Sequence, residues 1–278
     1  MKVNVILISY NQQQYIRQAI ESILMQKFDG EVEIIVADDS SKDSTFDIIK
    51  EYESKSPFRF VYMPRETNVG MRMNYKRAFA ACDGDYIAIL EGDDWWSSEH
   101  HLQQHVDMLE KKRKYSMSFN RIEIYNEDTS EYGLMHYYYP KDYIVYSLKD
   151  LIVRGDMIVN FSCCVFRAAP IKELPEKFFE LNFADWDLGM WMARYGRVVY
   201  HKLSTSVYRV NNKGQWTSMD KESKIQAMLK TLDDMDAFFD FKYKRWFDEG
   251  RYRVINGIEP EPYMTWKTKI KRIFHIVK

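Results

Sequence analysis

Residues 86–97 read YIAILEGDDWWS: five apolar or aromatic residues are followed by Glu91, Gly92, Asp93 and Asp94 and then by two tryptophans. A continuous apolar run of this kind is typical of a strand that is covered on both faces of a sheet. Two carboxylates ~4 Å apart would repel each other by about 4 kcal/mol at an effective dielectric constant of ~20. We therefore expect a positive partner at the end of this strand.

Similar apolar runs occur upstream at residues 3–8, 32–37 and 58–63, and segments with the apolar spacing of helices lie between them. This alternation predicts an α/β fold with a mostly parallel central sheet and flanking helices. Ligands of such sheets gather beyond the carboxyl ends of the strands. The polar residues expected there are Ser9-Tyr10-Asn11, Asp38-Asp39-Ser40, Asn68 with Gly70, and Glu91 to Asp94.

The pattern changes after residue 97. It predicts strands at 117–125 and 160–167, helices at 98–114, 147–154 and 185–195, and extended chain at 198–210. Apolar residues from about 220 to 247 predict one long helix. We therefore expect a domain over residues 1–217, divided near residue 97, and a C-terminal helical extension over 218–278.

Composition narrows the classes of protein to consider. The 40 basic and 41 acidic residues nearly balance, which argues against nucleic acid as the main partner. The three cysteines are Cys82, Cys163 and Cys164, and an odd number with two adjacent predicts reduced core residues in a cytoplasmic protein. No apolar run approaches the ~20 residues that span a bilayer.

The C-terminal stretch TWKTKIKRIFHIVK places its apolar residues near one helical face and its basic residues around the rest. This pattern suits a helix that lies on the anionic inner face of a membrane, as a peripheral contact. It suits equally a terminal helix that docks on its own domain or on the second subunit of a homodimer. Both interpretations stay open.

The acids at the strand ends suggest a chemistry. Asp93 and Asp94 are hard oxygen ligands suited to Mg²⁺ or Mn²⁺, which keep several positions for water and phosphates. The plainer alternative is that they solvate a loop and favour the following helix by only ~0.3 to 1 kcal/mol. If the carboxyl ends of the strands converge, Asp38, Asp39 and Tyr10 would share one cleft with them, and that cleft would suit a nucleotide.

Five stretches together resemble the family 2 glycosyltransferases: VNVILISYNQQQYI, IIVADDSSKDST, NVGM, GDYIAILEGDDWW and FADWDLGMWMARYG. They run in the family's order across roughly residues 3–218. The resemblance implies the GT-A fold and the transfer of a sugar, with inversion, from a nucleotide diphosphate to an acceptor hydroxyl. It also implies a nucleotide-binding half at 1–97 and an acceptor half at 98–217.

The same resemblance implies roles for individual residues. It assigns the donor site to Ser9, Tyr10, Asn11, Asp38, Arg72, Asn74, Glu91, Asp93 and Arg209. Within this set Asp38 would contact the base, with Tyr10 packed against it, and Asp93 would meet the ribose region. Asp94, with Asp93 beside it, would hold the Mn²⁺ or Mg²⁺ that bridges the phosphates. Glu91 stands where the family often has Asp.

The acceptor hydroxyl needs a base within about 2.6 to 3.2 Å of its oxygen. Asp185 in FADWDL matches the second acid of the family's Glu-Asp pair, whose first acid is replaced here by Ala184. Asp187 is the competing candidate, and an acid that only favours the helix N-terminus is the plainer alternative.

The segment SVYRVNNKGQWTS resembles the family's Tyr-Arg pair and the loop that closes over the donor. Arg209 would then be available to the phosphates. Asn211 stands where many relatives have a metal-binding His, so either its amide oxygen or water would fill that position. For Trp216 the plainer alternative is ordinary loop packing. The aromatic stretch at 135–146 is a candidate stacking platform for an acceptor sugar.

We conclude from the sequence that the chain is a metal-dependent inverting glycosyltransferase. UDP is the expected nucleotide, by resemblance, and the acceptor is a glycan or a lipid-linked glycan, as in bacterial surface polysaccharide synthesis. The alternatives are a nucleotidyltransferase, although SYNQQQYIRQ lacks the glycines of its phosphate loop, and a sugar-nucleotide or glycan binding module without turnover. The sequence does not identify the donor sugar.

Overall fold

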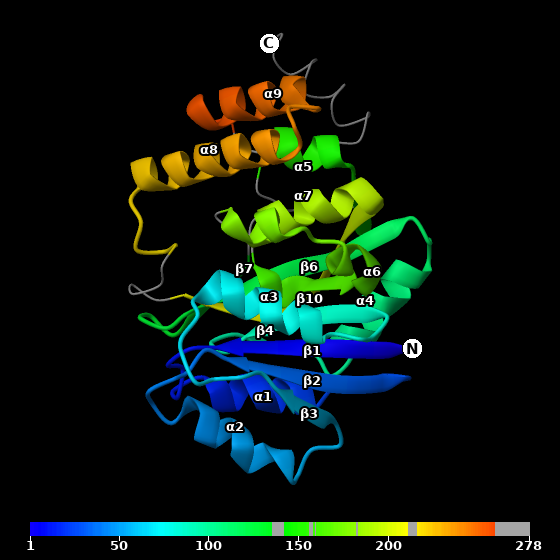
Figure 1. The fold of residues 1–278 in the computed structure, drawn as a ribbon, viewed down its shortest axis with the longest axis vertical. Coiled ribbons are helices and arrows are strands. Elements are labelled where there is room, and N and C mark those ends of the chain that lie inside the picture. Colours follow the sequence, from blue (N-terminus) through cyan, green and yellow to red (C-terminus); the bar gives the residue numbers. More distant parts are fainter. Residues whose placement is uncertain (135–141, 156–157, 159, 182, 211–215, 259–278) are drawn as a thin grey trace.

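The structure is a computed structural model, and it describes residues 1–134, 142–155, 158, 160–181, 183–210 and 216–258 (Figure 1). Its first half is an alternating α/β unit. The elements are β1 (Lys2–Ser9), α1 (Ile16–Leu24), β2 (Glu31–Asp38), α2 (Thr45–Glu53), β3 (Arg59–Tyr62), α3 (Met71–Ala81) and β4 (Tyr86–Glu91). The strands are parallel in the order β3-β2-β1-β4, which confirms the predicted sheet.

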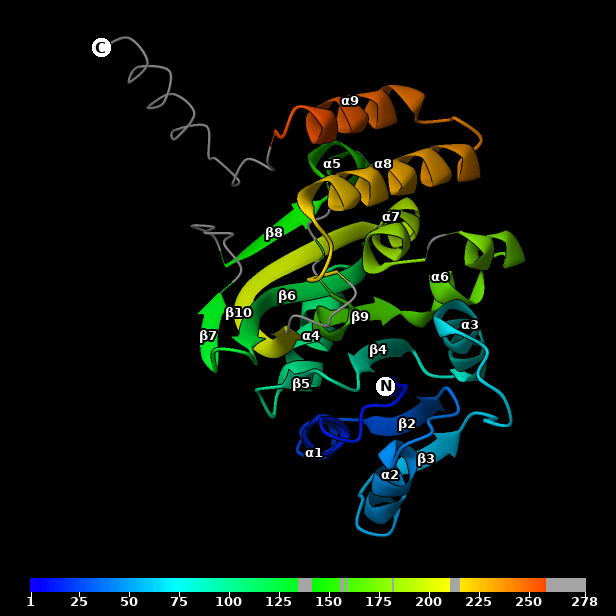
Figure 2. The same cartoon turned by 90° about the vertical axis from the view of Figure 1, so that its left-hand side faces the viewer.

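The second half extends the same sheet to β3-β2-β1-β4-β9-β6-β10-β5. Its strands are β5 (Trp95–Trp96), β6 (Tyr115–Asn126), β7 (Glu131–Leu134), β8 (Tyr143–Tyr146), β9 (Cys164–Arg167) and β10 (Arg197–Val210). β9 is antiparallel to both β4 and β6, whereas β10 runs parallel to β6. β10 is a long curved strand (Figure 2), and register shifts between His201 and Ser206 accompany its bend.

Three helices of this half lie within their predicted ranges: α4 (His101–Glu110), α5 (Leu148–Arg154) and α7 (Asp185–Tyr195). The short helix α6 (Ala168–Lys172) and the 3₁₀ turns at Phe161–Cys163 and Glu176–Glu180 were not predicted. The strand expected over 160–167 is therefore shorter than predicted. Its first part is a 3₁₀ turn because the side chain of Asn160 accepts a hydrogen bond from the Ser162 N–H and caps it.

The sheet is covered on both faces, so its central strands have no exposed side. Along β1, Val3, Val5 and Leu7 join the apolar core with α1, α2 and α4. Ile6 and Ile8 point the opposite way and join the core with α3 and α5 to α9. This two-sided burial is the reason that the strands read as continuous apolar runs. All three cysteines are buried in the described core, as predicted.

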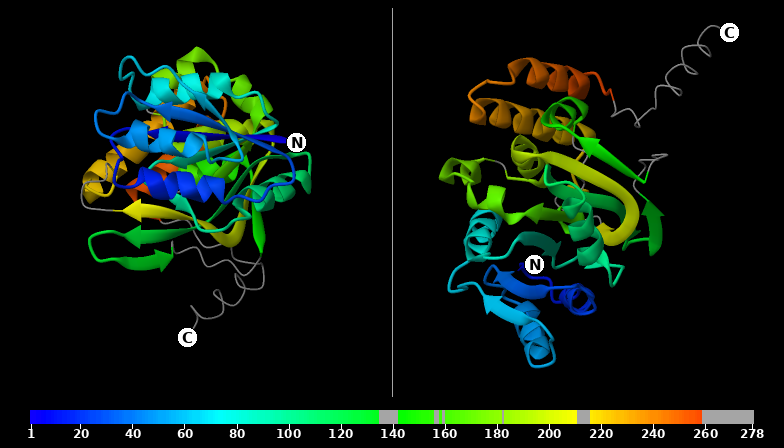
Figure 3. Two further views of the ribbon diagram at one scale, coloured as in Figure 1. Left: turned by 90° about the horizontal axis from the view of Figure 1, so that it is seen from below. Right: turned by 90° about the vertical axis from the view of Figure 1, so that its right-hand side faces the viewer.

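The C-terminal region forms two helices, α8 (Lys221–Phe238) and α9 (Lys244–Ile255), where the sequence predicted one. The chain reverses between them at Asp240 and Phe241, whose positive φ angles of 51° and 57° are incompatible with continuing the helix. Figure 3 shows the pair stacked over α5, at the end of the molecule remote from α2. Leu232 and Phe247 are fully buried there. A domain boundary at 217/218 stays a prediction.

Among the described helices, none is both long enough and apolar enough to cross a bilayer. The tail at 265–278 lies outside the described residues.

Candidate functional site

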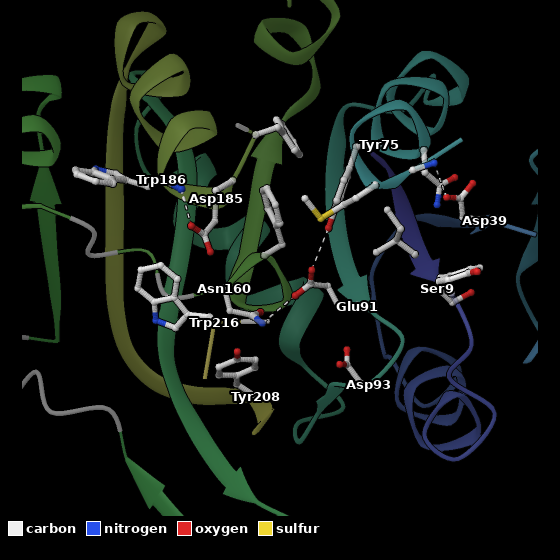
Figure 4. A pocket seen from close by; sticks show the side chains of 18 of the residues that line it. Ser9, Asp39, Tyr75, Glu91, Asp93, Asn160, Asp185, Trp186, Tyr208 and Trp216 are labelled. Atoms are coloured by element: carbon white, nitrogen blue, oxygen red, sulfur yellow. Dashed lines mark hydrogen bonds between the residues drawn. The ribbon is translucent and has the colours of Figure 1, made fainter. Parts of the chain in front are cut away.

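A cavity of about 690 Å³ opens at the carboxyl ends of β1 and β4 (Figure 4). Its walls come from β1, α3, β4, α7, β10 and α8 and from the residues that follow β1, β2 and β10. Of the residues predicted for the site, those that line it are Ser9, Tyr10, Asn74, Glu91, Asp93, Asp185 and Arg209. The parallel sheet thus brings side chains from distant parts of the sequence to one hollow.

The carboxylates of Glu91, Asp93 and Asp185 face the middle of this cavity (Figure 4). Glu91 accepts hydrogen bonds from the Asn160 amide at 3.0 Å and from the Tyr75 hydroxyl at 3.3 Å. Burial, followed by the charges of Asp93 and Asp185, raises the pKa of Glu91 to about 8. Burial also raises the pKa of Asp93. The like charges at this site are therefore costly without a cation.

Asp94 does not line the cavity. It is only 1% exposed, and its Oδ2 accepts hydrogen bonds from Asn160 at 2.8 Å and from the Ser162 hydroxyl at 2.7 Å. Its Oδ1 accepts from the Arg209 N–H at 2.9 Å. Asp94 therefore holds the wall behind the site together, whereas Asp93 lines the cavity, and a metal contact by either residue stays a prediction.

The residues present fit a divalent cation. Mg²⁺ and Mn²⁺ bind through one or two carboxylates when phosphates and water supply the other ligands. Glu91 and Asp93 offer such a pair, and their mutual repulsion is the feature that a cation would relieve. In the described part of the chain, no group of three His, Cys, Asp or Glu residues is arranged as a complete metal site.

Asp185 lines the cavity at the first position of α7, where its carboxylate accepts a hydrogen bond from the Trp186 N–H at 2.6 Å. Asp187, the competing candidate, is buried and does not line the cavity. Its carboxylate instead accepts from the Ala184 N–H at 2.9 Å and caps the helix. Burial raises the pKa of Asp187 well above its ordinary value. The geometry therefore favours Asp185 over Asp187 as the acid that meets a substrate.

Of the two acids at the end of β2, Asp38 is buried in the wall and Asp39 reaches the cavity. Asp38 is 1% exposed, forms an ion pair with Arg65 at 3.0 Å and binds both Ser41 and Ser9, so it is directed away from the cavity. Asp39 lines the cavity. Asp39 is thus the acid of this pair that reaches the cavity, and a base contact by Asp38 stays a prediction.

Asp39 is held in place by the turn that enters α3. Its two carboxylate oxygens accept hydrogen bonds from the Val69 and Gly70 N–H groups at 2.9 and 2.8 Å. Gly70 has a φ of 80°, a conformation that side chains rarely adopt, and this turn is the reason for a glycine here.

Two other predicted donor residues lie outside the cavity lining. Asn11 adopts a positive φ of 54° and binds the Ser41 hydroxyl and the Lys42 N–H, so it shapes the loop after β1. Arg72 donates to the carbonyls of Glu180 and Leu181 at 3.0 Å. Asn74 lines the cavity but its amide is committed to the Ala37 carbonyl at 2.7 Å. These side chains position the walls.

The guanidinium of Arg209 is also engaged. Its Nε donates to the Asp93 carbonyl at 2.9 Å and its Nη2 to Gln18 at 2.6 Å. Its central carbon lies within 5.4 Å of the ring centroids of Tyr15, Trp95 and Tyr125. Arg209 therefore fixes the loop that carries Asp93, and a contact with phosphate stays a prediction. Asn211 lies outside the described residues.

Sequence reasoning missed three residues of the site: Asn160, Tyr208 and the cavity-facing role of Trp216. Tyr208 precedes Arg209 in the recognised Tyr-Arg pair, which was a usable signal. Asn160 had none, because only the paired strands bring it beside Glu91 and Asp94. Of the aromatic stretch at 135–146, residues 135–141 lie outside the described residues, and Tyr143 and Tyr146 do not line the cavity.

Comparison with solved structures identifies the fold. TarS of S. aureus in complex with UDP-GlcNAc matches with a TM-score of 0.61 and 20% identity, over 84% of this chain and 66% of that chain. The mannosyltransferase PcManGT from Pyrobaculum calidifontis, in complex with GDP-Man and Mn²⁺, matches with a TM-score of 0.62 and 12% identity, over 99% and 79%. At these identities the likeness shows the fold alone, and it is the GT-A fold.

Comparison of sequences identifies the family. The uncharacterized protein Rv1520 of Mycobacterium tuberculosis (strain ATCC 25618 / H37Rv) is 31% identical over 246 residues, covering 84% of this chain and 67% of Rv1520. The sequence model described as Glycosyl transferase family 2 matches residues 4–174. Because that match covers more than half of the chain, the chain belongs to glycosyl transferase family 2.

Proposed function

We propose that this glycosyltransferase moves a sugar from a UDP-sugar to an acceptor hydroxyl, with inversion and with Mn²⁺ or Mg²⁺ as cofactor. The observation that carries the proposal is the convergence of Glu91, Asp93 and Asp185 on one cavity at the carboxyl ends of β1 and β4. The binding of UDP-GlcNAc by TarS and of Mn²⁺ by PcManGT supports the choice of donor class and metal.

The base of the donor is proposed to lie against Tyr10, Ser9 and Asp39. Tyr10 lines the cavity and is 47% exposed as a residue, so its ring is available to pack against an aromatic base. The Oδ1 of Asp39 accepts from the Val69 N–H and from Arg77 Nη2 at 3.3 Å, whereas Oδ2 accepts from the Gly70 N–H and can accept a second hydrogen bond. A uracil ring N–H is a donor that matches this remaining capacity.

The diphosphate is proposed to lie near Asp93, with Glu91 beside it. When bound there, a divalent cation supplies positive charge that stabilises the negative charge developing on the leaving diphosphate. Arg209 keeps Asp93 in place through the Asp93 carbonyl, and Asn160 orients Glu91 through its amide. These contacts hold the two carboxylates in the cavity in spite of their repulsion.

Asp185 is proposed to act as the base. As the acceptor oxygen forms its bond to the anomeric carbon, the proton of that hydroxyl passes to the Asp185 carboxylate. The bond between the anomeric carbon and the diphosphate breaks, and its electron pair leaves with the diphosphate. Attack opposite the leaving group inverts the configuration, and Asp185 faces Asp93 across the cavity, as this requires (Figure 4).

The acceptor is proposed to be a glycan or a lipid-linked glycan in the synthesis of a surface polysaccharide. A peripheral membrane contact or a homodimer contact through the tail at 265–278 stays a prediction, because the tail lies outside the described residues.

The test is a screen of UDP- and GDP-sugars, assayed by nucleoside diphosphate release with Mn²⁺ and with EDTA. We expect slow hydrolysis of at least one UDP-sugar that requires the metal. Binding of UDP without hydrolysis of any donor, even with added glycan acceptors, would instead indicate a binding module. Equal rates with Mn²⁺ and EDTA would refute the metal dependence.

A further inference from the structure

The cavity has two walls of different character. Ser9 and Asp39 belong to the wall formed by the β1 and β2 side, whereas Asp185, Tyr208 and Trp216 lie on the opposite wall (Figure 4). The proposed donor occupies the first wall. The second wall carries the proposed base and therefore remains for the acceptor, whose hydroxyl attacks the donor.

Trp216 presents an aromatic surface to this second wall. The residue is 43% exposed, although it lines a cavity. The Lys224 ammonium lies 5.8 Å from the ring centroid, and the Trp216 carbonyl accepts a hydrogen bond from the Met219 N–H at 3.3 Å, so backbone and ring are both held. A pyranose ring has a face of C–H groups and a rim of hydroxyls, and it can stack on such a ring without losing its hydrogen bonds.

Tyr208 adds a polar group beside this aromatic surface. Its hydroxyl points into the hollow between Trp216 and Asp93 (Figure 4). Within the described chain that hydroxyl has no hydrogen-bond partner. A hydroxyl that lines a cavity in this way is available to donate to, or accept from, a hydroxyl of a bound sugar.

The charge of the second wall excludes one class of sugar. Its further described lining residues are Ala184, Trp186, Thr217, Met219, Ala227, Met228 and Thr231, which are all uncharged. Asp185 is the one charged side chain among the described residues of that wall, and it is an acid. The guanidinium of Arg209 is committed to Asp93 and Gln18. Lys224 lies near the Trp216 ring but does not line the cavity. A carboxylate or phosphate on a sugar ring beside Asp185 would therefore meet repulsion, with no cation among the described lining residues of that wall to offset it.

We propose that Trp216 and Tyr208 form the acceptor subsite and that this subsite takes an uncharged pyranoside, stacked on Trp216 with a hydroxyl directed at Asp185. This inference rests on the proposed function, because it assigns the second substrate of that reaction. The inference goes beyond the proposed function because it names the chemical class of the acceptor ring and the side chains that select that ring.

The experiment uses the full chain with UDP and Mn²⁺ and measures binding of simple glycosides by saturation-transfer NMR. The probes are the methyl glycosides of glucose, galactose, mannose and N-acetylglucosamine, with methyl glucuronide as the charged counterpart. We expect at least one neutral glycoside to bind, and the glucuronide to bind roughly tenfold more weakly than methyl glucoside, as one mispaired buried charge would require. W216A should weaken glycoside binding roughly tenfold, or about 1.4 kcal/mol, with partial recovery in W216F.

Two further variants make the result specific. Y208F should weaken binding several-fold without loss of folding, and Y252A, at a tyrosine that is 61% exposed on α9, should change nothing. The inference is overturned if no neutral glycoside binds the wild type, if W216A binds as well as the wild type, or if the glucuronide binds as tightly as the glucoside.

Hydrolysis of UDP-sugar without acceptor separates this inference from the proposed function. Loss of UDP binding as well as glycoside binding in W216A would place Trp216 at the donor instead, which also overturns the inference. Absence of hydrolysis in the wild type itself would count against the proposed function.

Discussion

The neighbouring carboxylates of Asp93 and Asp94 serve opposite sides of one wall. Asp93 lines the cavity, whereas Asp94 is buried and accepts hydrogen bonds from Asn160, Ser162 and the Arg209 backbone. The turn after β4 directs the Asp93 side chain into the cavity and the Asp94 side chain into the protein interior behind it. Substitutions at the two positions should therefore have different kinds of effect.

Asp93→Asn should abolish the stimulation of UDP binding by Mn²⁺ and leave the free energy of unfolding unchanged or slightly raised, because it removes a buried like charge. Asp94→Ala should lower the free energy of unfolding by about 1 to 3 kcal/mol, since three buried donors lose their acceptor. Calorimetry with UDP and Mn²⁺, beside urea unfolding, measures both. Metal-stimulated binding that survives in Asp93→Asn would remove Asp93 from the metal site.

Asp185→Asn should keep donor binding and lose transfer, by about 10²- to 10⁴-fold in kcat, because an amide cannot take the proton of the acceptor. Asp187→Asn is the matched control. Its amide oxygen can still accept from the Ala184 N–H, so both stability and transfer should stay close to those of the wild type. Unchanged transfer by Asp185→Asn, measured with an acceptor identified in the glycoside screen, would exclude Asp185 as the base.

Tyr10→Ala should weaken UDP binding roughly five- to tenfold, since an aromatic contact contributes about 0.5 to 1.5 kcal/mol beyond its buried area. The same variant should unfold at the wild-type urea midpoint, because the Tyr10 side chain is 47% exposed in the free protein. Tyr10→Phe serves as the control that keeps the ring. If Tyr10→Ala binds UDP as well as Tyr10→Phe does, the base lies elsewhere.

A buried row of aromatic rings contributes stability that is lost in mild acid. Trp96, His101, His105 and His201 follow one another with successive ring centroids 4.4 Å apart, and Trp96 stacks on His101. Burial, with a contribution from the charge of Lys111, lowers the pKa of His201 to about 4, and burial lowers those of His101 and His105 well below their ordinary value.

At these histidines the unfolded chain binds more protons than the folded chain between pH 6.5 and about 4, so their contribution to the free energy of unfolding decreases as the pH falls through that range. The buried acids Glu91, Asp93 and Asp187, whose pKa values are raised, contribute in the opposite direction. His201 alone accounts for up to about 3 kcal/mol of the loss at the histidines. His201→Phe keeps an aromatic ring and removes this term, so the variant should gain stability relative to the wild type as the pH falls, as urea unfolding at pH 7, 5.5 and 4.5 would show. A variant with the same slope as the wild type would contradict this assignment.

Local sequence was sufficient for most of the fold. The apolar runs of β1, β2 and β4 predicted a parallel sheet because strands buried on both faces need apolar residues at every position. The prediction of one long helix over 220–247 was wrong. Asp240 and Phe241 adopt a left-handed backbone conformation, which the identity of these two residues does not predict. Their conformation is set by the packing of α9 on α8 and α5.

Local sequence also determined that acidic residues lie at the tips of β2 and β4, and the family pattern located the acid at the start of α7. Only the tertiary structure decided which acid of each pair faces the cavity. Asp39 and Asp93 point inward because Arg65 and Asn160, remote in sequence, hold Asp38 and Asp94 in the wall. A side chain's direction depends on the partners that satisfy its neighbours, and those partners become adjacent only when the strands pair.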